Sequence, residues 1–166
     1  MKRIMLLLAA VALLALSLAP VVQAQGQGGA PKDVDETLFP IEPGAFPGTC
    51  DFTVGLEQSG KGKTIMLPDD KGLILTSPGL DATLTNLDNP EHPQETYNIT
   101  GSVHVSTDPE TGDVTTVLTG RNLAIDPEAG FVIAVGDFSF VFNEQGELIQ
   151  PLEGSGQLID VCEALA

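Results

Sequence analysis

The sequence predicts an all-β protein folded as an antiparallel meander. Apolar and polar residues alternate in several long runs, turn sequences rich in Pro, Asp, Asn and Gly separate these runs, and no helical period appears before the C-terminus. Alternation indicates strands because successive side chains of a strand point to opposite faces. Glycines inside long strands, such as Gly101 and Gly136, favour a curled sheet. We therefore expect a small β-barrel, with a two-sheet sandwich as the alternative.

The N-terminus has the features of a secretory signal. Two basic residues precede an apolar run over residues 4–18, and small residues lead up to Ala24. We expect residues 1–24 to be a signal peptide that is cleaved after Ala24; an uncleaved anchor is the alternative. The run is shorter than the roughly 20 residues that span a bilayer. The mature chain is therefore expected to be secreted (extracytoplasmic), without a transmembrane segment.

The predicted mature chain is strongly acidic. Cleavage leaves 166 − 24 = 142 residues and removes two basic residues, so the formal charge changes from −16 to −18. Negative charge argues against binding of nucleic acid or of anionic membrane surfaces, because both repel carboxylates. The chain has no nucleotide motif, and we expect no cofactor.

Composition divides the mature chain into two parts. Residues 25–48 are rich in Gly, Pro, Gln and Ala, which predicts a flexible segment, although the apolar residues at 38–41 could dock on the domain. Residues 49–166 are predicted to form a single β-domain.

The two cysteines, Cys50 and Cys162, lie near the two ends of this domain. An even number of cysteines in an exported chain predicts a disulfide. Two free thiols, or pairing with another chain, are the alternatives. A bridge would close a loop of roughly 110 residues and stabilise the fold by about 4–5 kcal/mol through the unfolded state.

Alternation places the elements along the domain. Short strands are expected between residues 65 and 87, and longer ones over 97–106, 114–119 and 132–142. In the last of these, Phe138, Phe140 and Phe142 share one face with Val132 and Ala134, and we expect them to form core. A short helix or turn is expected over Leu158–Leu165.

Four turn sequences join these strands. Residues 69–72, 108–112, 126–130 and 143–146 each begin with Asp or Asn and end with Gly. This order suits a type I turn that is closed by a left-handed glycine. Each turn is expected to form a hairpin, so the C-terminal half is predicted to be a meander.

No catalytic or metal motif is evident, and the catalytic residues are unknown. His104 lies among Ser and Thr residues, as a hydrolase would require, but a solvent-facing polar strand has the same pattern. His92 lies in a loop, and two histidines with two bridged cysteines provide too few ligands for zinc or copper. Because the calcium-loop signature is also absent, we expect no metal site.

Arg121 and Asp137 are the candidate ligand-binding residues. Arg121 is the only arginine outside the predicted signal peptide, and Asp137 interrupts an apolar series. If the turn at 126–130 joins their strands, residue 119 opposes Asp137, and Arg121 is its diagonal neighbour. One interpretation is an ion pair between adjacent strands. The alternative is a charged group at the mouth of a barrel that orients the polar end of a ligand.

Several stretches resemble a family of small secreted bacterial all-β proteins that is known only as uncharacterised. They are ILTSPGLDATLTNLD at 74–88, NITGSVHV at 98–105, TGRNL at 119–123 and GQLIDVC at 156–162. The resemblance implies a single secreted domain with one cysteine near each end. It implies no activity, ligand or catalytic residue.

These observations predict a secreted, non-enzymatic β-domain. It is expected to bind a partner or a small apolar ligand, or to act as an envelope-associated module. The alternative is a small barrel enzyme of the isomerase or cyclase type, which needs no recognisable motif. A filled interior favours the first function, whereas a deep cavity with convergent polar groups favours ligand binding or catalysis.

Overall fold

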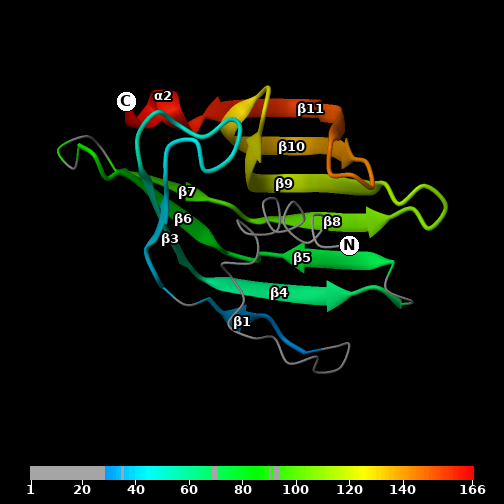
Figure 1. Cartoon of the computed structure of the whole chain (residues 1–166). Coiled ribbons are helices and arrows are strands. Elements are labelled where there is room, and N and C mark those ends of the chain that lie inside the picture. Colours follow the sequence, from blue (N-terminus) through cyan, green and yellow to red (C-terminus); the bar gives the residue numbers. More distant parts are fainter. Residues whose placement is uncertain (1–28, 35, 69–70, 90, 92–93) are drawn as a thin grey trace.

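The computed structural model describes residues 29–166 except 35, 69–70, 90 and 92–93, so the predicted signal peptide lies outside the described residues. The described chain forms two antiparallel sheets and a short helix (Figure 1). The all-β class predicted from the alternating pattern is confirmed.

The larger sheet contains, in spatial order, β1 (Lys32–Asp33), β4 (Lys61–Met66), β5 (Gly72–Thr76), β8 (Gly101–Thr107), β9 (Val114–Asp126), β10 (Gly130–Phe142) and β11 (Leu148–Asp160). The smaller sheet contains β2 (Phe39–Ile41), β3 (Val54–Ser59), β6 (Asp81–Asn86) and β7 (Glu95–Asn98). Helix α2 (Val161–Leu165) follows β11 directly.

The expected small barrel is not confirmed. In the described residues, β1 and β11 lie at opposite ends of the larger sheet and do not pair with each other. Successive strand pairs belong to different sheets: β2 and β3 to the smaller, β4 and β5 to the larger, β6 and β7 to the smaller again. The two-sheet alternative is therefore closer to the observed architecture.

The single strand expected over residues 97–106 is in fact two strands. β7 ends at Asn98 in the smaller sheet, and β8 begins at Gly101 in the larger one. The apolar alternation continues through the corner because Ile99 is only 5% exposed and fills the space between the sheets. The close approach of Gly101 to the Arg121 carbonyl oxygen leaves no space for a Cβ atom, which explains the glycine at this corner.

The segment ahead of residue 49 is more ordered than its composition predicted. β1 pairs with β4, and β2 pairs with β3. Ile41 is 2% exposed and belongs to the core, so part of the apolar cluster at 38–41 does dock on the domain. Pro40 is tolerated in β2 because this strand lies at a sheet edge. The ordered part of the chain therefore begins before residue 49.

The predicted C-terminal meander is confirmed. β8, β9, β10 and β11 are consecutive neighbours in the larger sheet. Their hairpins end in Gly112, Gly130 and Gly146, with φ angles of 76°, 83° and 80°. In the two turns that start with Asp-Pro, the Asp carboxylate accepts hydrogen bonds from the next free backbone N–H groups. The turn at 69–72 lies partly outside the described residues.

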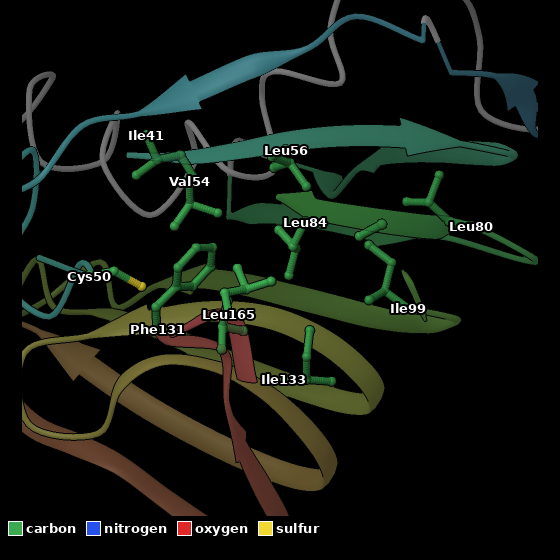
Figure 2. Close-up of a cluster of buried hydrophobic side chains, with 12 residues drawn as sticks. Ile41, Cys50, Val54, Leu56, Leu80, Leu84, Ile99, Phe131, Ile133 and Leu165 are labelled. Atoms are coloured by element: carbon green, nitrogen blue, oxygen red, sulfur yellow. The ribbon is translucent and has the colours of Figure 1, made fainter. Parts of the chain in front are cut away.

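The first core lies between the two sheets. Phe131 and Ile133 of β10 point toward Val54 and Leu84 of the smaller sheet, with Leu165 of α2 beside them (Figure 2). Its buried residues are Ile41, Cys50, Val54, Leu56, Leu80, Ala82, Leu84, Ile99, Phe131, Ile133, Val161 and Leu165. This core therefore joins the N-terminal strands, both sheets and the C-terminal helix.

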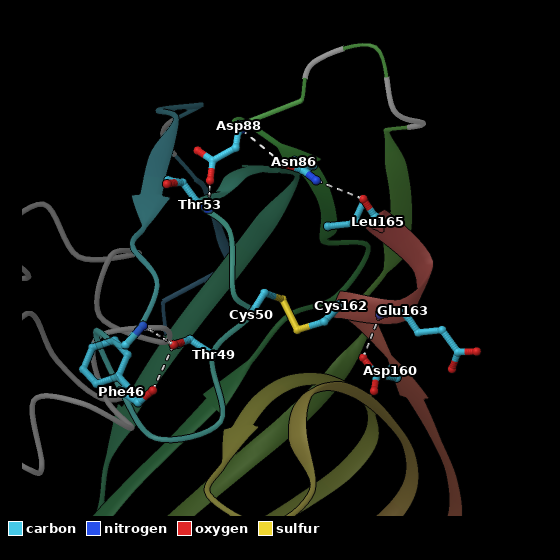
Figure 3. Close-up of a disulfide and its surroundings, with 11 residues drawn as sticks. Phe46, Thr49, Cys50, Thr53, Asn86, Asp88, Asp160, Cys162, Glu163 and Leu165 are labelled. Carbon is cyan, nitrogen blue, oxygen red and sulfur yellow. Dashed lines mark hydrogen bonds between the residues drawn. A yellow bond between two sulfur atoms is a disulfide. The ribbon is translucent and has the colours of Figure 1, made fainter.

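The predicted disulfide closes this core. Cys50 and Cys162 are bonded across a sequence separation of 112 residues (Figure 3). The helix that carries Cys162 is shorter than expected, because residues 158–160 belong to β11. Asp160 caps α2 by accepting a hydrogen bond from the Glu163 N–H. The amide of Asn86 donates to the Leu165 carbonyl and fixes the far end of the helix on β6.

A row of glycines crosses the larger sheet. Gly101, Gly120, Gly136 and Gly156 are register partners on β8, β9, β10 and β11, and we call this row the glycine crease. The last three have φ angles of 82°, 135° and 148°, which residues other than glycine rarely adopt. The crease therefore allows three long strands to bend at the same level.

The bend brings distant parts of the meander together. Asp126 opposes Gly130 at the start of β10, whereas Leu152 lies beside the end of β10, ten residues away. An extended strand of that length would separate them by about 33 Å. Instead, the Asp126 carboxylate accepts a hydrogen bond of 3.2 Å from the Leu152 N–H. The hairpin that joins β9 and β10 (yellow in Figure 1) accordingly turns across the direction of the long strands, toward β11.

The folded meander encloses the second core. Its buried residues are Leu118, Ala124, Val132, Ala134, Phe138 and Phe140, and Phe142 packs against them. The shared face predicted for the three phenylalanines with Val132 and Ala134 is confirmed. The rings of Phe140 and Phe142 meet edge to face with centroids 5.8 Å apart.

Candidate functional site

A line of polar side chains crosses the larger sheet next to the glycine crease. Register partners on six neighbouring strands form this line, which we call the polar row: Lys63, Thr76, Ser102, Thr119, Asp137 and Ser155. Val103, Leu118 and Phe138, which alternate with them, contact the second core. The polar row therefore lies on the opposite face of the sheet.

A groove of about 400 Å³ opens over the middle of the polar row. Glycines of the crease line it together with five residues that have hydroxyl side chains. These five are Thr76, Ser77, Thr100, Ser102 and Thr119. The groove lies where the chain passes from the smaller sheet to the larger one. The geometry of this corner therefore shapes the groove.

Backbone hydrogen bonds fix the walls of the groove. The Ser77 hydroxyl lies 3.0 Å from the Ile99 carbonyl oxygen and 3.2 Å from that of Gly101, either of which can accept its proton. The Thr100 hydroxyl accepts a hydrogen bond of 3.0 Å from the Gly79 N–H. These bonds hold both sides of the corner in place, so the groove is formed before any partner arrives.

The floor of the groove retains hydrogen-bonding capacity. The Ser102 and Thr119 hydroxyls are 2.6 Å apart, so one donates to the other. Since each hydroxyl can donate one hydrogen bond and accept two, this pair keeps one free donor and several acceptors. Thr76 makes no side-chain hydrogen bond within the described part of the chain. All three side chains are partly exposed.

The part of this face between β5 and β10 has little charge, whereas the rows end at Lys63 on β4 and at Glu153, opposite Ser139, on β11. Between β5 and β10, the two neighbouring rows on this face are Ile74–His104–Val117–Ser139 and Ser106–Thr115–Val141. Asp137 is thus the single acidic residue of the three rows between these strands. This part of the face is therefore poor in carboxylates, although the whole chain has 23 acidic residues.

Arg121 and Asp137 lie at the border of this site. The predicted register is observed, with Thr119 opposite Asp137. The Arg121 backbone N–H donates to the Thr100 carbonyl, which places this residue next to the groove. Among the described residues, however, no ion pair joins Arg121 to Asp137; the ion pair present links Lys61 to Asp33 at 4.0 Å.

The glycine crease explains why Arg121 and Asp137 do not form an ion pair. Gly120 and Gly136 stand between the two charged residues and bend both strands there, so diagonal neighbours of a straight sheet need not meet. Both side chains are exposed. Their role in ligand binding remains a prediction.

The remaining sequence candidates are not assembled into a site. His104 is exposed on β8, opposite Ile74 and Val117. His92 lies outside the described residues. In the described ranges, no three His, Cys, Asp or Glu side chains gather closely enough to hold a metal ion.

The polar row itself was missed by reasoning from the sequence. The Ser and Thr residues at 102–106 and 115–119 were recognisable as polar strand faces. Their alignment across six strands depends on the register of five strand pairs, which no local pattern gives.

Comparison with known protein families, with curated proteins and with solved structures gave no significant match. Within the described residues, no helix has the length and apolar character needed to cross a membrane.

Proposed function

We propose that this protein is an exported, non-enzymatic module that binds a neutral polysaccharide across the polar row and its groove. The single observation that carries the proposal is the polar row, because hydroxyl side chains at strand spacing offer repeated donors and acceptors. Sugar hydroxyls are complementary, since each is also both a donor and an acceptor. The disulfide is compatible with an extracytoplasmic location.

The charge distribution supports an uncharged partner. The predicted mature chain repels polyanions, while the face around the polar row has few carboxylates to attract a polycation. At the middle of the row, between Thr76 and Thr119, a neutral polymer makes hydrogen bonds to hydroxyls without burying unpaired charge.

The spacing of the row supports a glycan over a peptide. Neighbouring strands are about 4.8 Å apart, which is close to the length of one sugar ring in an extended glycan. In an extended peptide, side chains on the same face repeat about every 6.6–6.8 Å. This repeat differs from the spacing of the strands, so successive side chains would not align with successive strands. We expect the glycan to run across the strands, along the polar row.

Binding of this kind depends on hydrogen bonds. The chain has no Trp, and its single Tyr97 lies in the smaller sheet, away from the polar row. Stacking of sugars on aromatic rings therefore does not contribute there. We expect weak binding of short oligosaccharides and stronger retention by long chains, which present many sites at once.

The interior supports a polar partner over a small apolar ligand or a barrel enzyme. Both cores are filled by apolar side chains. Five of the eight residues that line the groove carry a hydroxyl, and the groove is open to solvent. These features fit a surface that binds an extended polar polymer.

Affinity electrophoresis tests the proposal. Gels containing neutral polysaccharides, such as xyloglucan, mixed-linkage glucan or galactomannan, should retard the wild-type protein, whereas gels containing polygalacturonate should not. A double variant, Ser102→Ala with Thr119→Val, removes the central hydroxyl pair and should migrate without retardation.

The smaller sheet provides a matched control. The Thr83 and Thr96 hydroxyls form a similar cross-strand pair at 3.0 Å. Thr83→Val with Thr96→Val should leave retardation unchanged. Equal retardation of both double variants, or none with any neutral polysaccharide, would reject this function.

Export requires its own test. Expression of the full chain in a bacterial host should yield extracytoplasmic protein whose first residue is Gln25. Retention of the uncut chain in the membrane fraction would contradict the export part of the proposal and leave glycan binding to be judged separately.

A further inference from the structure

β11 is a long strand at a sheet edge. It has 13 residues, whereas the strands at the other described sheet ends, β1, β2 and β7, have two, three and four. Proteins usually keep edge strands short or obstructed, because their unpaired backbone groups attract other strands. Pro151 and a register shift opposite Val141 obstruct the first part of β11. From Glu153 to Leu158, every residue is exposed.

The direction of the free backbone groups follows from the pairing with β10. A Cβ atom on Gly156 would collide with the Val135 carbonyl oxygen, so this oxygen points toward β11. Val135 opposes Gln157, and these two therefore form a hydrogen-bonded pair. Alternation then directs the N–H and C=O groups of Leu158 away from the sheet.

The charged residues along this edge are all acidic, and Glu153 and Asp160 lie at the two ends of its exposed part. Residues 144–166 contain no Lys, Arg or His, and their acidic residues are Glu144, Glu147, Glu153, Asp160 and Glu163. A second copy pairing along this edge would bring like charges together. A strand with basic side chains would instead meet opposite charges.

We propose that residues 153–160 of β11 dock an extended, Lys- or Arg-bearing segment of a partner protein, which adds to the larger sheet as a further strand. Gly154 and Gly156 have no side chains beyond hydrogen, which leaves space for the partner's side chains on the face of the sheet that these two residues share. This surface is the edge of the sheet, whereas the polar row lies on its face. The two proposals can therefore fail independently.

A capped peptide of alternating Lys and Val provides the probe. Added to the isotope-labelled full-length protein, it should shift the backbone amide signals of residues 153–160 more than those of other acidic segments. A peptide of alternating Glu and Val should not. Glu153→Lys should weaken binding of the Lys–Val peptide, because it removes an attractive charge from the edge.

Leu158 allows a matched pair of variants. Leu158→Pro removes one outward N–H and should weaken binding roughly tenfold, the equivalent of one hydrogen bond. Leu158→Val keeps the N–H and should bind like the wild type. Because proline could disturb β11 itself, a Lys–Val peptide with alternate backbone nitrogens methylated is tested on the wild type and should not bind.

Three results would overturn the proposal. They are wild-type affinity in a folded Leu158→Pro variant, signal shifts spread evenly over acidic surfaces away from β11, and self-association of the free protein that Leu158→Pro abolishes. The last result would identify a second copy as the occupant of the edge.

Discussion

The two cores of this protein are held together in different ways. The first core joins residues from the two ends of the described chain, such as Ile41 and Leu165, and a disulfide closes it. The second core is formed by buried residues of β9 and β10, which bend at the glycine crease, and by residues of the neighbouring strands β8 and β11 that pack against them. Bringing chain ends together costs loop entropy, which a covalent bridge reduces in the unfolded state. Consecutive strands have short loops and need only a place where the backbone can bend.

Removal of the disulfide should have the largest effect and should act on the first core. Cys50→Ala with Cys162→Ala should lower the free energy of unfolding by about 4–5 kcal/mol, the amount that the chain-entropy model gives for so long a loop. Denaturant titration of oxidised wild type, reduced wild type and the double variant measures this. Amide exchange should accelerate more in β3 and β6 than in β9. A loss below about 1 kcal/mol would show that the bridge is dispensable.

The crease is tested by adding a single methyl group. In Gly136→Ala, the new Cβ would collide with the Ser155 carbonyl oxygen, at a φ of 135°. We expect a loss of about 3 kcal/mol or more. Gly79→Ala is the control, because Gly79 also has a positive φ, of 70°, but no atom within 4 Å of the Cβ position. Its expected cost is about 1 kcal/mol. Equal costs for both variants would show that the close packing in the crease adds nothing to the cost of a positive φ.

Asp126 is the polar contact that holds the folded meander. Asp126 is 4% exposed, and its carboxylate accepts hydrogen bonds from the N–H groups of Glu128, Ala129 and Leu152. Asp126→Ala should cost about 2–3 kcal/mol and should accelerate exchange of the Leu152 amide. Asp108→Ala removes the equivalent turn bonds at an exposed site and should cost about 1 kcal/mol. If the two variants lose equal stability, the contact with Leu152 contributes nothing.

The smallest expected effect concerns Tyr97, at the margin of the first core. Burial, and secondarily the Glu95 carboxylate, raises the pKa of its phenol above 10.0. The folded state therefore holds the phenolic proton more tightly than the unfolded state does. Its contribution to stability is complete below pH 10 and falls as the pH rises through the pKa of the folded state. Because the chain has one Tyr and no Trp, an ultraviolet absorbance titration reports this group alone; a midpoint at or below 10.0 would contradict the burial of Tyr97.

Local features of the fold could be predicted from the sequence because they depend on neighbouring residues. The Asp-Pro turns, the shared face of Phe138 and Phe140, and the register of Thr119 against Asp137 all follow from alternation and turn length. The pairing of Cys50 with Cys162 followed from the cysteine count.

Features that depend on distant residues could not be predicted. Ile99 continues the alternation of a single strand, and only the presence of a second sheet explains why the chain turns there. Gly136 was recognisable as a bend, but its alignment with three other glycines depends on the register of the whole meander. The polar row depends on register in the same way, which is why the site was found only as the isolated residues Arg121 and Asp137.

The proximity of Asp126 and Leu152 tests the folded meander most directly. Nuclear Overhauser measurements on the labelled protein should detect contact between the Asp126 β-protons and the Leu152 amide proton, whose nitrogen lies 3.2 Å from the carboxylate. A sheet that stays extended through the glycine crease would separate these groups by about 33 Å and give no signal. Detection supports a second core enclosed by the bent meander; absence of the contact in the folded protein would contradict it.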